Sequence, residues 1–350
     1  LTAIANGKHV VTANKALIAV HGNEIFRAAH EKGVIVAFEA AVAGGIPVIK
    51  SLREGLGANR IEWVAGIING TGNFILTHMR DEGRAFEDVL AEAQALGYAE
   101  ADPTFDVEGI DAAHKLTILA SIAYGVPLQF EKAFTEGISR ITAEDVEQAD
   151  NLGYVIKHLG ISKRTDQGLE LRVHPTLIPK ERLLANVHGV KNAIAVMGDA
   201  VGPTLYYGAG AGAEPTASAV VADLLDVARD IATDHHYRVP YLAFSGIDED
   251  VSQLPIMPME EITTAYYLRL LAVDRPGVLA RVATILAEQG ISIEALIQKE
   301  ATEGELVPII LLTHRTKEKQ MNEAIREIEA MADIAGPVTR IRVESLDEGE

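Results

Sequence analysis

The sequence contains no cysteine and few aromatic residues, and both absences narrow what the chain does. Cys is 0 among 350 residues, which excludes disulfides, thiolate metal sites and a cysteine nucleophile, and fits a reducing compartment. Only 5% of the residues are aromatic, and the longest apolar runs, such as Val34–Phe38 and Ile309–Leu312, have the length of a strand, too short for a membrane span. We expect no signal peptide, and a cytoplasmic protein.

Positive charge is also scarce. Lys+Arg number 31 and Asp+Glu number 50, which gives a formal net charge of −19. This shortage argues against a nucleic-acid-binding surface, which needs many Lys and Arg side chains facing phosphates. With 48% hydrophobic and 23% charged residues the balance is that of a globular protein, and the length predicts two or three domains. We therefore expect a soluble protein that handles small molecules, with neither nucleic acid nor membrane as a partner.

The first part of the chain lacks the Gly-rich turn of a complete nucleotide-binding domain. A strand at His9–Thr12, a helix at Asn23–Lys32 and a strand at Val34–Glu39 form the back half of a doubly wound α/β unit. No G-x-G-x-x-G follows a predicted strand. We interpret residues 1–46 as the remnant of an NAD(P)-binding, Rossmann-like domain in a chain truncated at its N-terminus.

Residues 47–245 mix helices and strands, which predicts an α+β domain with a mixed sheet. The predicted helices are Pro47–Leu56, Phe74–Glu82, Phe86–Leu96, Asp111–Tyr124 and Thr216–Asp230. The predicted strands are Arg60–Ile68, Glu170–Leu177, Ala193–Gly198 and Thr204–Gly208.

The last part of the chain has the clearest pattern. Residues 246–262 are acidic and contain two prolines, which predicts a linker. Residues 263–346 follow the order βαββαβ, which is the ferredoxin-like arrangement. Its predicted strands are Ala265–Val273, Ile291–Glu300, Leu306–His314 and Val338–Glu344, with a turn at Glu303-Gly304, and its predicted helices are Gly277–Gln289 and Lys317–Met331.

An acid-rich segment, residues 97–115, runs into an apolar helix. Asp111 and Lys115 are four residues apart and therefore share one face of that helix. Because the helix is apolar almost all round, Lys115 is expected near buried surface. An acidic loop without a matching basic run also needs a cationic partner, which a substrate ammonium group would supply. Taken alone, the spacing favours an ordinary ion pair at the surface.

Five segments, in this order along the first 245 residues, resemble those of homoserine dehydrogenases. They are Thr12-Ala13-Asn14-Lys15, Phe38–Pro47 (FEAAVAGGIP), Ile67–Leu76 (IINGTGNFIL), Gly97-Tyr98-x-Glu100-x-Asp102-Pro103-x-x-Asp106-Val107-x-Gly109-x-Asp111-x-x-x-Lys115, and Gly208–Val220 (GAGAGAEPTASAV). The resemblance implies reversible, NADH- or NADPH-dependent reduction of L-aspartate 4-semialdehyde to L-homoserine, on the route to threonine, methionine and isoleucine.

The same resemblance assigns roles to individual side chains. It implies that Lys115 is the general acid and base, and that Glu100 and Asp111 hold the amino and hydroxyl ends of the substrate. Lys15 matches a lysine beside the nicotinamide, and Asp106 matches an acid of the same cavity. An ammonium group next to an oxygen that gains negative charge both stabilises that charge and donates a proton.

Cofactor and cation sites are also implied by the resemblance. The positions that match cofactor contacts are Ala13, Lys15, Gly97 and Gly212. The positions that match a sodium-binding loop, in which mainly backbone carbonyls coordinate the ion, are Glu39, Val42, Gly44 and Ile46. Without the resemblance, the loop that contains Glu39, Val42, Gly44 and Ile46 would be interpreted as an ordinary turn between domains. The glycine-rich segment 208–212 would be interpreted as a flexible linker.

Near residue 274 the sequence resembles the opening of an ACT domain. Asp274-Arg275-Pro276-Gly277 ends a predicted strand and begins a predicted helix, and free backbone N–H groups at a helix start suit the carboxylate of an amino acid. The resemblance implies threonine as the effector. Pairing between strand edges favours a homodimer or homotetramer. The alternative is a dimerisation module that binds nothing.

Two further expectations depend on the missing front half of the nucleotide domain. The preference between NAD and NADP is not determined, and the chain alone is expected to be weakly active or inactive. The alternative function is a non-catalytic, amino-acid-binding regulatory or dimerisation subunit, although the retained acids and Lys115 argue against it. The lack of cysteine excludes an acyl-enzyme aldehyde oxidation. His114 and His235-His236 show no metal-ligand spacing and are expected to be ordinary surface or hydrogen-bonded histidines.

Overall fold

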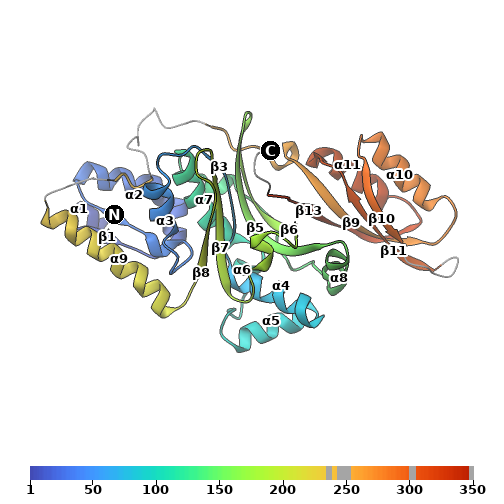
Figure 1. Ribbon diagram of the computed structural model, residues 1–350, viewed down its shortest axis with the longest axis horizontal. Helices are drawn as coiled ribbons and strands as arrows, with labels where there is room; N and C mark the ends of the chain where they lie inside the picture. The colour runs from blue at the N-terminus through green and yellow to red at the C-terminus, as the bar shows by residue number, and fades with distance from the viewer. Residues whose placement is uncertain (234–238, 243–253, 299–304, 347–350) are drawn as a thin grey trace.

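The computed structural model describes residues 1–233, 239–242, 254–298 and 305–346. The molecule is elongated: the N-terminal residues lie at one end, the βαββαβ unit lies at the other, and a layer of long strands lies between them (Figure 1). Of the predicted linker 246–262, only residues 254–262 are described, and the turn predicted at Glu303-Gly304 lies outside the described residues. Within the part of the chain that is described, no helix has both the length and the apolar character needed to cross a bilayer.

Most strands belong to one large mixed sheet. Its eleven strands follow the order β10-β11-β9-β13-β6-β5-β3-β7-β8, with β12 beside β9 and β4 beside β6. Their bounds are β3 Ile61–Ile67, β4 Phe134–Thr135, β5 Tyr154–Thr165, β6 Gly168–Pro179, β7 Lys191–Gly198, β8 Gly202–Ala209, β9 Thr263–Val273, β10 Ile293–Gln298, β11 Leu306–Thr313, β12 Thr316–Lys317 and β13 Ile334–Val343. A separate parallel pair consists of β1 Val10–Val11 and β2 Val36–Ala37.

Helices cover the sheets and fill the space between them. Their bounds are α1 Thr2–Ala5, α2 Lys15–Lys32, α3 Val48–Lys50, α4 Gly70–Glu82, α5 Phe86–Ala95, α6 Thr104–Val107, α7 Ile110–Tyr124, α8 Ala143–Asn151, α9 Ala213–Ala232, α10 Val278–Glu288 and α11 Glu318–Glu329. Helix α7 packs against α2 on one side and against β3, β5 and β6 on the other. It is buried over almost its whole length, which explains its apolar sequence.

Helix α2 is longer than the sequence predicted. It begins at Lys15, whereas the predicted helix begins at Asn23. The Oδ1 atom of Asn14 accepts a hydrogen bond from the N–H of Leu17 at 2.9 Å, which is an N-cap. The additional turns bring Lys15 to the first position of the helix, directly after β1.

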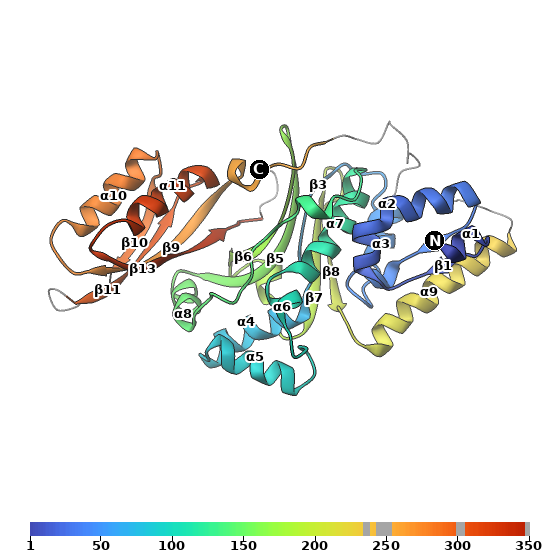
Figure 2. The same ribbon diagram turned by 180° about the vertical axis from the view of Figure 1, so that it is seen from behind.

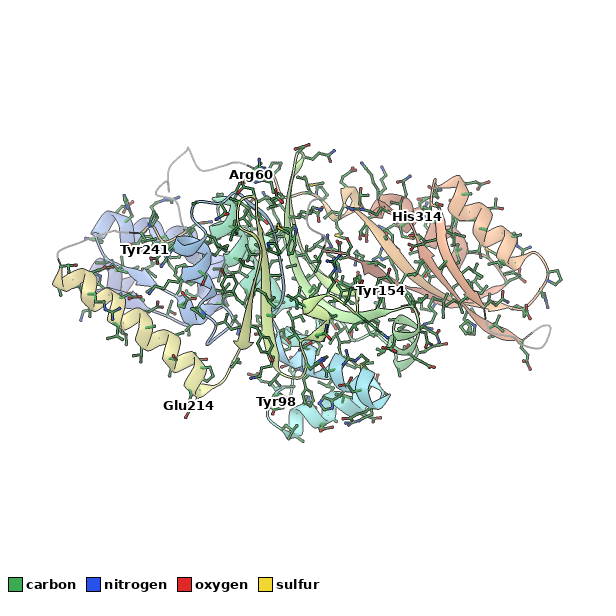
Figure 3. All side chains as sticks on the ribbon, in the orientation of Figure 1. Arg60, Tyr98, Tyr154, Glu214, Tyr241 and His314 are labelled. Atoms are coloured by element: carbon green, nitrogen blue, oxygen red, sulfur yellow. The ribbon has the colours of Figure 1, made fainter. Side chains whose placement is uncertain are left out.

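The helix after the glycine-rich segment 208–212 lies against the N-terminal part. Helix α9 contacts β1 and the short 3-10 helix Glu39–Ala41, although the sequence analysis placed it in the central domain. Figures 1 and 2 show it alongside α1 and β1 at this end of the molecule. Figure 3 shows Glu214 at its first turn, on the side of the central strands. The chain therefore returns to the nucleotide part after completing the central layer.

Strand β5 was not predicted. It pairs with β6 over its whole length, from Tyr154↔Pro179 to Thr165↔Gly168. Its sequence carries Lys157 and His158 side by side, which interrupts an apolar pattern, yet both side chains are buried. Lys157 donates from Nζ to the carbonyl of Val187 at 2.6 Å and to Asn73 Oδ1 at 3.1 Å, so its polar end is satisfied inside the protein.

The predicted order βαββαβ is confirmed for the C-terminal part. Strands β10, β11, β9 and β13 lie in this order, and α10 and α11 cover one face (Figure 2). The outer edge of β13 pairs in parallel with β6, in the register Arg342↔Thr176 and Val343↔Leu177. The sequence predicts that the strand edges of this module pair with another copy. This edge is instead occupied by the same chain.

Two buried arginines reinforce the junction between β13 and the central layer. The Arg342 guanidinium, 0% exposed, contacts Glu318 Oε1 at 2.5 Å and Glu136 Oε2 at 3.0 Å. Arg172 contacts Glu170 at 2.8 Å and Glu344 at 2.7 Å. Because each guanidinium contacts two carboxylates, its charge is balanced within the low-dielectric interior.

Candidate functional site

A cleft opens where β1 ends and α2 begins. It has a volume of 680 Å³ and is lined by residues 11–16 together with Phe105. Small-molecule sites typically have volumes of roughly 300–1,000 Å³. Ligands of open α/β sheets bind beyond the carboxyl ends of the strands, which is the position of this cleft. Of the predicted cofactor residues, Ala13 and Lys15 line it.

Three predicted catalytic side chains meet at the start of α7. Lys15 Nζ lies 2.9 Å from Asp111 Oδ1, and Lys115 Nζ lies 2.7 Å from Asp111 Oδ2. Lys115 also donates to the carbonyl of Ile68 at 2.7 Å. The side chain of Lys15 is 37% exposed, whereas those of Lys115 and Asp111 are 10% and 5% exposed. The interpretation of Asp111 and Lys115 as a surface ion pair is therefore wrong, because the pair is buried.

Electrostatics keep Asp111 ionised. Burial by itself raises the pKa of this carboxyl, but the charges of Lys115 and Lys15, together with hydrogen bonds from Lys115 and Asn69, hold the pKa well below its usual range. An ionised Asp111 in turn stabilises both ammonium groups. The three side chains thus form a charged unit with one carboxylate between two cations.

Asn69 joins this unit to a second acid, and the sequence analysis did not single it out. Helix α4 begins at Gly70, four residues earlier than predicted, and Asn69 is its N-cap: Oδ1 accepts from the N–H of Gly72 at 2.8 Å. The Nδ2 atom donates to Asp106 Oδ1 at 2.7 Å and to Asp111 Oδ2 at 2.9 Å. The signal that could have identified Asn69 is its residue type at the end of a strand, which favours a helix cap over a turn.

Asp106 has a different environment from Asp111. Burial raises its pKa, the charge of Asp111 raises it further, and the hydrogen bond from Asn69 lowers it. Among the described residues, no lysine or arginine forms an ion pair with Asp106. The predicted proximity of Asp106 to Asp111 and Lys115 is present, but it is mediated by Asn69.

The other candidates from the acid-rich segment lie outside this network. Glu100 is exposed, and its carbonyl accepts from Gln94 Nε2 at 3.0 Å. Gly97 is exposed and has a φ of 76°. The carbonyl of the neighbouring Tyr98 accepts from Thr71 Oγ1 at 2.7 Å, so this segment lies against the start of α4 (Figure 3).

Gly212 is the N-cap of α9, with a φ of 119°, and it does not line the cleft between β1 and α2. Glu100, Gly97 and Gly212 therefore remain candidate ligand contacts, supported by the resemblance alone.

His114 differs from its predicted environment. The side chain is buried, with its ring between Phe105 at 5.4 Å and Phe130 at 4.1 Å, and its Nδ1 atom has no hydrogen-bond partner among the described residues. Burial lowers its pKa. The expectation of a surface or hydrogen-bonded histidine is thus wrong for His114. His235 and His236 lie outside the described residues.

The Glu39 side chain accepts hydrogen bonds from the backbone. Its two carboxylate oxygens accept from the N–H groups of Ile49 and Lys50, each at 2.9 Å, and its own N–H donates to Asp223 Oδ2 at 2.9 Å. Burial raises the pKa of Glu39 to about 7, although the two backbone hydrogen bonds oppose that effect. This carboxylate is committed to the start of α3, so a cation at this loop depends on carbonyl oxygens.

The loop after Glu39 offers such oxygens. Within the described residues, no N–H or O–H donates to the carbonyl of Val42 or Gly44, whereas the carbonyl of Ile46 accepts from Val48 N–H at 2.7 Å. Ala43 and Gly44 have φ values of 54° and 46°, and this left-handed backbone turns the loop sharply. Free carbonyl oxygens are the ligands that hard cations prefer. The described residues contain no cluster of three or more carboxylate or histidine side chains that could hold a metal ion.

The predicted effector residues line a separate cavity at the other end of the molecule. Asp274, Arg275, Pro276 and Gly277 surround a volume of 460 Å³ together with Gln298 and Ile309. Gly277 has a φ of 92° and precedes α10. Gln298 Nε2 donates to Asp274 Oδ1 at 3.3 Å, which connects this turn to β10.

Comparison with known proteins gives consistent matches along the chain. Family models match at residues 1–39 (homoserine dehydrogenase, NAD-binding domain), 47–225 (homoserine dehydrogenase) and 266–333 (ACT domain). The homoserine dehydrogenase of Pseudomonas aeruginosa is 70% identical over 99% of this chain and 80% of its own length, and that of Neisseria gonorrhoeae is 59% identical over the same shares.

Solved structures agree with these matches. A homoserine dehydrogenase from Thiobacillus denitrificans is 68% identical and superposes with a TM-score of 0.94 over 99% of this chain and 78% of its own. A hyperthermophilic archaeal homoserine dehydrogenase in complex with NADPH is 30% identical, with a TM-score of 0.57 over 65% of this chain and 66% of its own.

Proposed function

The chain belongs to the homoserine dehydrogenase family, and on that premise we propose which of its residues carry out the reaction. It is an oxidoreductase with a nicotinamide dinucleotide-binding part and a C-terminal ACT domain. We propose Lys115, Lys15 and Asp111 as the catalytic residues. The observation that carries this proposal is the Asp111 carboxylate held between two ammonium groups at the edge of the cleft.

Lys115 is proposed as the proton donor to the aldehyde oxygen. A nicotinamide cofactor, when bound, supplies the hydride that the aldehyde carbon accepts. The carbonyl oxygen then gains negative charge and takes a proton from Lys115 Nζ, which yields the alcohol; in the reverse direction the same amine accepts that proton. Asp111 and the carbonyl of Ile68 hold Nζ in place from two sides. Because Nζ is already held in position, little free energy is needed to orient the proton donor when the substrate reacts.

The substrate is proposed to bind through its ammonium group to carboxylates. Asp106 has no ion-pair partner among the described residues and lies next to Asp111, so it is available to a cation. Glu100 is exposed on the preceding segment and is proposed as a second contact. Hydrogen bonds between an ammonium and a carboxylate are stronger than neutral ones.

The proposed cofactor contacts are Ala13, Lys15, Gly97 and Gly212, for either NADH or NADPH. The fit rests on the cleft after β1, where the backbone of residues 11–16 is open to a ligand. Lys15 faces this cleft and Asp111 at once, so it is proposed to orient the cofactor relative to the substrate.

A sodium ion is proposed at the loop of Glu39, Val42, Gly44 and Ile46, bound mainly through carbonyl oxygens. The free carbonyls of Val42 and Gly44 support it. If Gly44 carried a Cβ, that atom would lie 2.6 Å from the carbonyl oxygen of Gly210. A cation here would therefore brace the contact between the loop and the glycine-rich segment before α9.

We propose four parts along the chain: the nucleotide remnant 1–46, the catalytic domain 47–245, the linker 246–262 and the ACT domain 263–346. Helix α9 of the second part packs back onto the first. Threonine is proposed as the effector in the cavity at residues 274–277, where the turn before α10 suits an amino-acid carboxylate.

The free edge at β10 supports a homodimer or homotetramer. The lack of cysteine fits the cytoplasm.

The test of the catalytic proposal measures L-homoserine oxidation with NADP⁺ and NAD⁺, and L-homoserine binding by calorimetry. We expect binding that Asp111→Asn weakens at least tenfold, because the substitution removes the charge between the two lysines. Binding that is equally tight in Asp111→Asn would contradict the proposed site. Threonine is tested separately by thermal shift, with Gly277→Ala expected to abolish its effect.

A further inference from the structure

The side chain of Asn69 bridges the two carboxylates of the site, Asp106 and Asp111. Its amide donates one hydrogen bond to Asp106 and one to Asp111, at 2.7 and 2.9 Å. We infer that Asn69 is a positioning residue that fixes Asp106 for the α-ammonium group of the substrate and thereby sets the preference for amino-acid aldehydes and alcohols. This inference rests on the proposed function of Asp106.

The orientation of the Asn69 amide is set by its neighbours. Its Oδ1 faces the N–H of Gly72 at 2.8 Å, and its Nδ2 faces two carboxylate oxygens. The reverse orientation would place an oxygen against two carboxylates and an N–H against another N–H. The Asn69 side chain is 5% exposed, so water does not replace these bonds.

The backbone beneath Asn69 cannot shift freely. If Gly70 carried a Cβ, that atom would lie 2.9 Å from the carbonyl oxygen of Val190. On the other side, Thr71 donates to the carbonyl of Tyr98 at 2.7 Å. The start of α4 is therefore held between two loops, and Asn69 is a rigid support for the carboxylates.

Asp106 needs such support more than Asp111 does. Asp111 has two lysines, whereas Asp106 has the Asn69 amide as its hydrogen-bond donor. The charged and titratable groups that face Asp106 are Lys15 from α2 and Asp111 and Lys115 from α7. Burial and Asp111 both raise the pKa of Asp106, and the amide opposes them. Without the amide, the pKa of Asp106 rises further, and the carboxylate loses the hydrogen bond that fixes its position.

The consequence is a preference for substrates with an α-ammonium group. An ionised Asp106 next to Lys115 attracts a cationic group of the substrate and holds it at a fixed distance from the carbon that reacts. A chain-matched alcohol without the amino group, 4-hydroxybutyrate, gains nothing from this carboxylate. Asn69 would thus contribute to specificity without touching the reacting atoms.

Two substitutions separate this role from helix capping. Asn69→Ser keeps an oxygen that caps α4 but has no amide to bridge the acids, whereas Asn69→Ala loses both functions. Asn59→Ser is the matched control, because Asn59 also uses both ends of its amide, with Leu56 and Val201, far from any carboxylate of the site. Each protein is studied as the full 350-residue chain.

The first measurement is the titration of Asp106 by carboxyl ¹³C NMR without substrate. We expect its midpoint to rise by about one pH unit in both Asn69 variants, since hydrogen bonds to charged groups contribute about that much. The Asn59→Ser midpoint should equal that of the unsubstituted chain. An unchanged midpoint in Asn69→Ser would overturn the inference, whether or not the chain binds homoserine.

The second measurement is calorimetric binding of L-homoserine and 4-hydroxybutyrate between pH 5 and 8. We expect Asn69→Ser to weaken homoserine binding about tenfold, to raise the pH below which binding is lost, and to leave 4-hydroxybutyrate unaffected. Only Asn69→Ala should also lower the melting temperature. Equal losses for both ligands would reduce Asn69 to a structural role. If the unsubstituted chain binds neither ligand, the proposed function fails, and the NMR titration still decides the role of Asn69.

Discussion

Lys115 and Asp111 form an ion pair one helical turn apart inside the protein, with Nζ 2.7 Å from Oδ2. Asp111 lies in the first turn of α7, where the positive end of the helix dipole favours a carboxylate. From the second turn, Lys115 contacts Asp111 and the carbonyl of Ile68. One helix therefore supplies both the proposed proton donor and the carboxylate that holds it.

Replacing Lys115 with Ala is expected to remove the proton donor. Whatever rate of homoserine oxidation the unsubstituted chain supports should fall about 10²- to 10⁴-fold, because general acid–base catalysis contributes about that factor. Homoserine binding should change little, since Asp106 remains. Steady-state kinetics and calorimetry check the two expectations. Lys8→Ala, at an exposed lysine, is the control, and turnover at the unsubstituted rate in Lys115→Ala would exclude this role.

Glu39 gives the protein a pH-dependent stability. Its pKa rises from 4.5 in the unfolded chain to about 7 in the folded one, mainly because of burial. Between these values the folded state binds more protons than the unfolded state, so the free energy of unfolding decreases as the pH rises from 4.5 to 7. The loss attributable to Glu39 is on the order of 3 kcal/mol.

Glu39→Gln is expected to flatten that decrease. Gln retains an oxygen that accepts a backbone N–H of α3, but it does not titrate. Urea unfolding at several pH values from 4.5 to 8 measures the slope, and Glu147→Gln, at an exposed position, controls for the loss of one charge. Asp223 faces Glu39 and has a raised pKa as well, so a residual slope of the same sign remains. An unchanged slope in Glu39→Gln would contradict the assignment.

Arg342 is expected to be among the most sensitive positions for stability. Arg342→Met leaves Glu318, 3% exposed, with Arg340 as its remaining guanidinium partner, at 2.8 Å. Breaking a buried pair completely costs roughly 3–5 kcal/mol, and because the contact with Arg340 remains, we expect a loss of about 3 kcal/mol. The double substitution Arg342→Met with Glu318→Gln should recover part of that loss, because no uncompensated charge stays buried.

The control for Arg342 is Arg326→Met, which removes an arginine whose side chain is 74% exposed and whose ion pair with Glu323 lies at the surface. Its effect should be below about 1 kcal/mol. Guanidinium unfolding measures all three variants. Equal destabilisation at the two arginines would show that burial does not govern the contribution of Arg342.

The sodium proposal predicts that the stability of the chain depends on the cation. Replacing NaCl with tetramethylammonium chloride at equal ionic strength should lower the melting temperature, because a bound ion stabilises only the folded state. Gly44→Ala should abolish this difference, since its Cβ would contact Gly210 and its φ of 46° disfavours a side chain. Gly55→Ala, where a Cβ meets nothing within 4 Å, should retain it. A difference that persists in Gly44→Ala would place the ion elsewhere.

How far the sequence predicts the structure depends on the range of the interaction. The spacing of Asp111 and Lys115 identifies a local pair, and the order βαββαβ follows from hydrophobic patterns that are local as well. Asn69 was missed because Asn-Gly after a strand is also typical of a turn. Strand β5 was missed because Lys157 and His158 are buried only through contacts with distant segments.

The junction between β6 and β13 shows a limit of a different kind. These strands are more than 150 residues apart, and nothing in either strand alone specifies the other. Lys15 shows the same limit: its contact with Asp111 joins two helices that are remote in sequence. Such contacts depend on how complete elements pack, which a single sequence does not reveal through its periodicity.

The shared edge of β6 and β13 also has a thermodynamic consequence. Backbone hydrogen bonds and the ion pairs of two buried arginines cross this edge. Separating the ACT domain would therefore expose the backbone of both strands and leave several buried charges without partners. The two parts should therefore melt as one cooperative unit. A ligand that binds the folded ACT domain should therefore also raise the melting temperature of the part that carries Lys115.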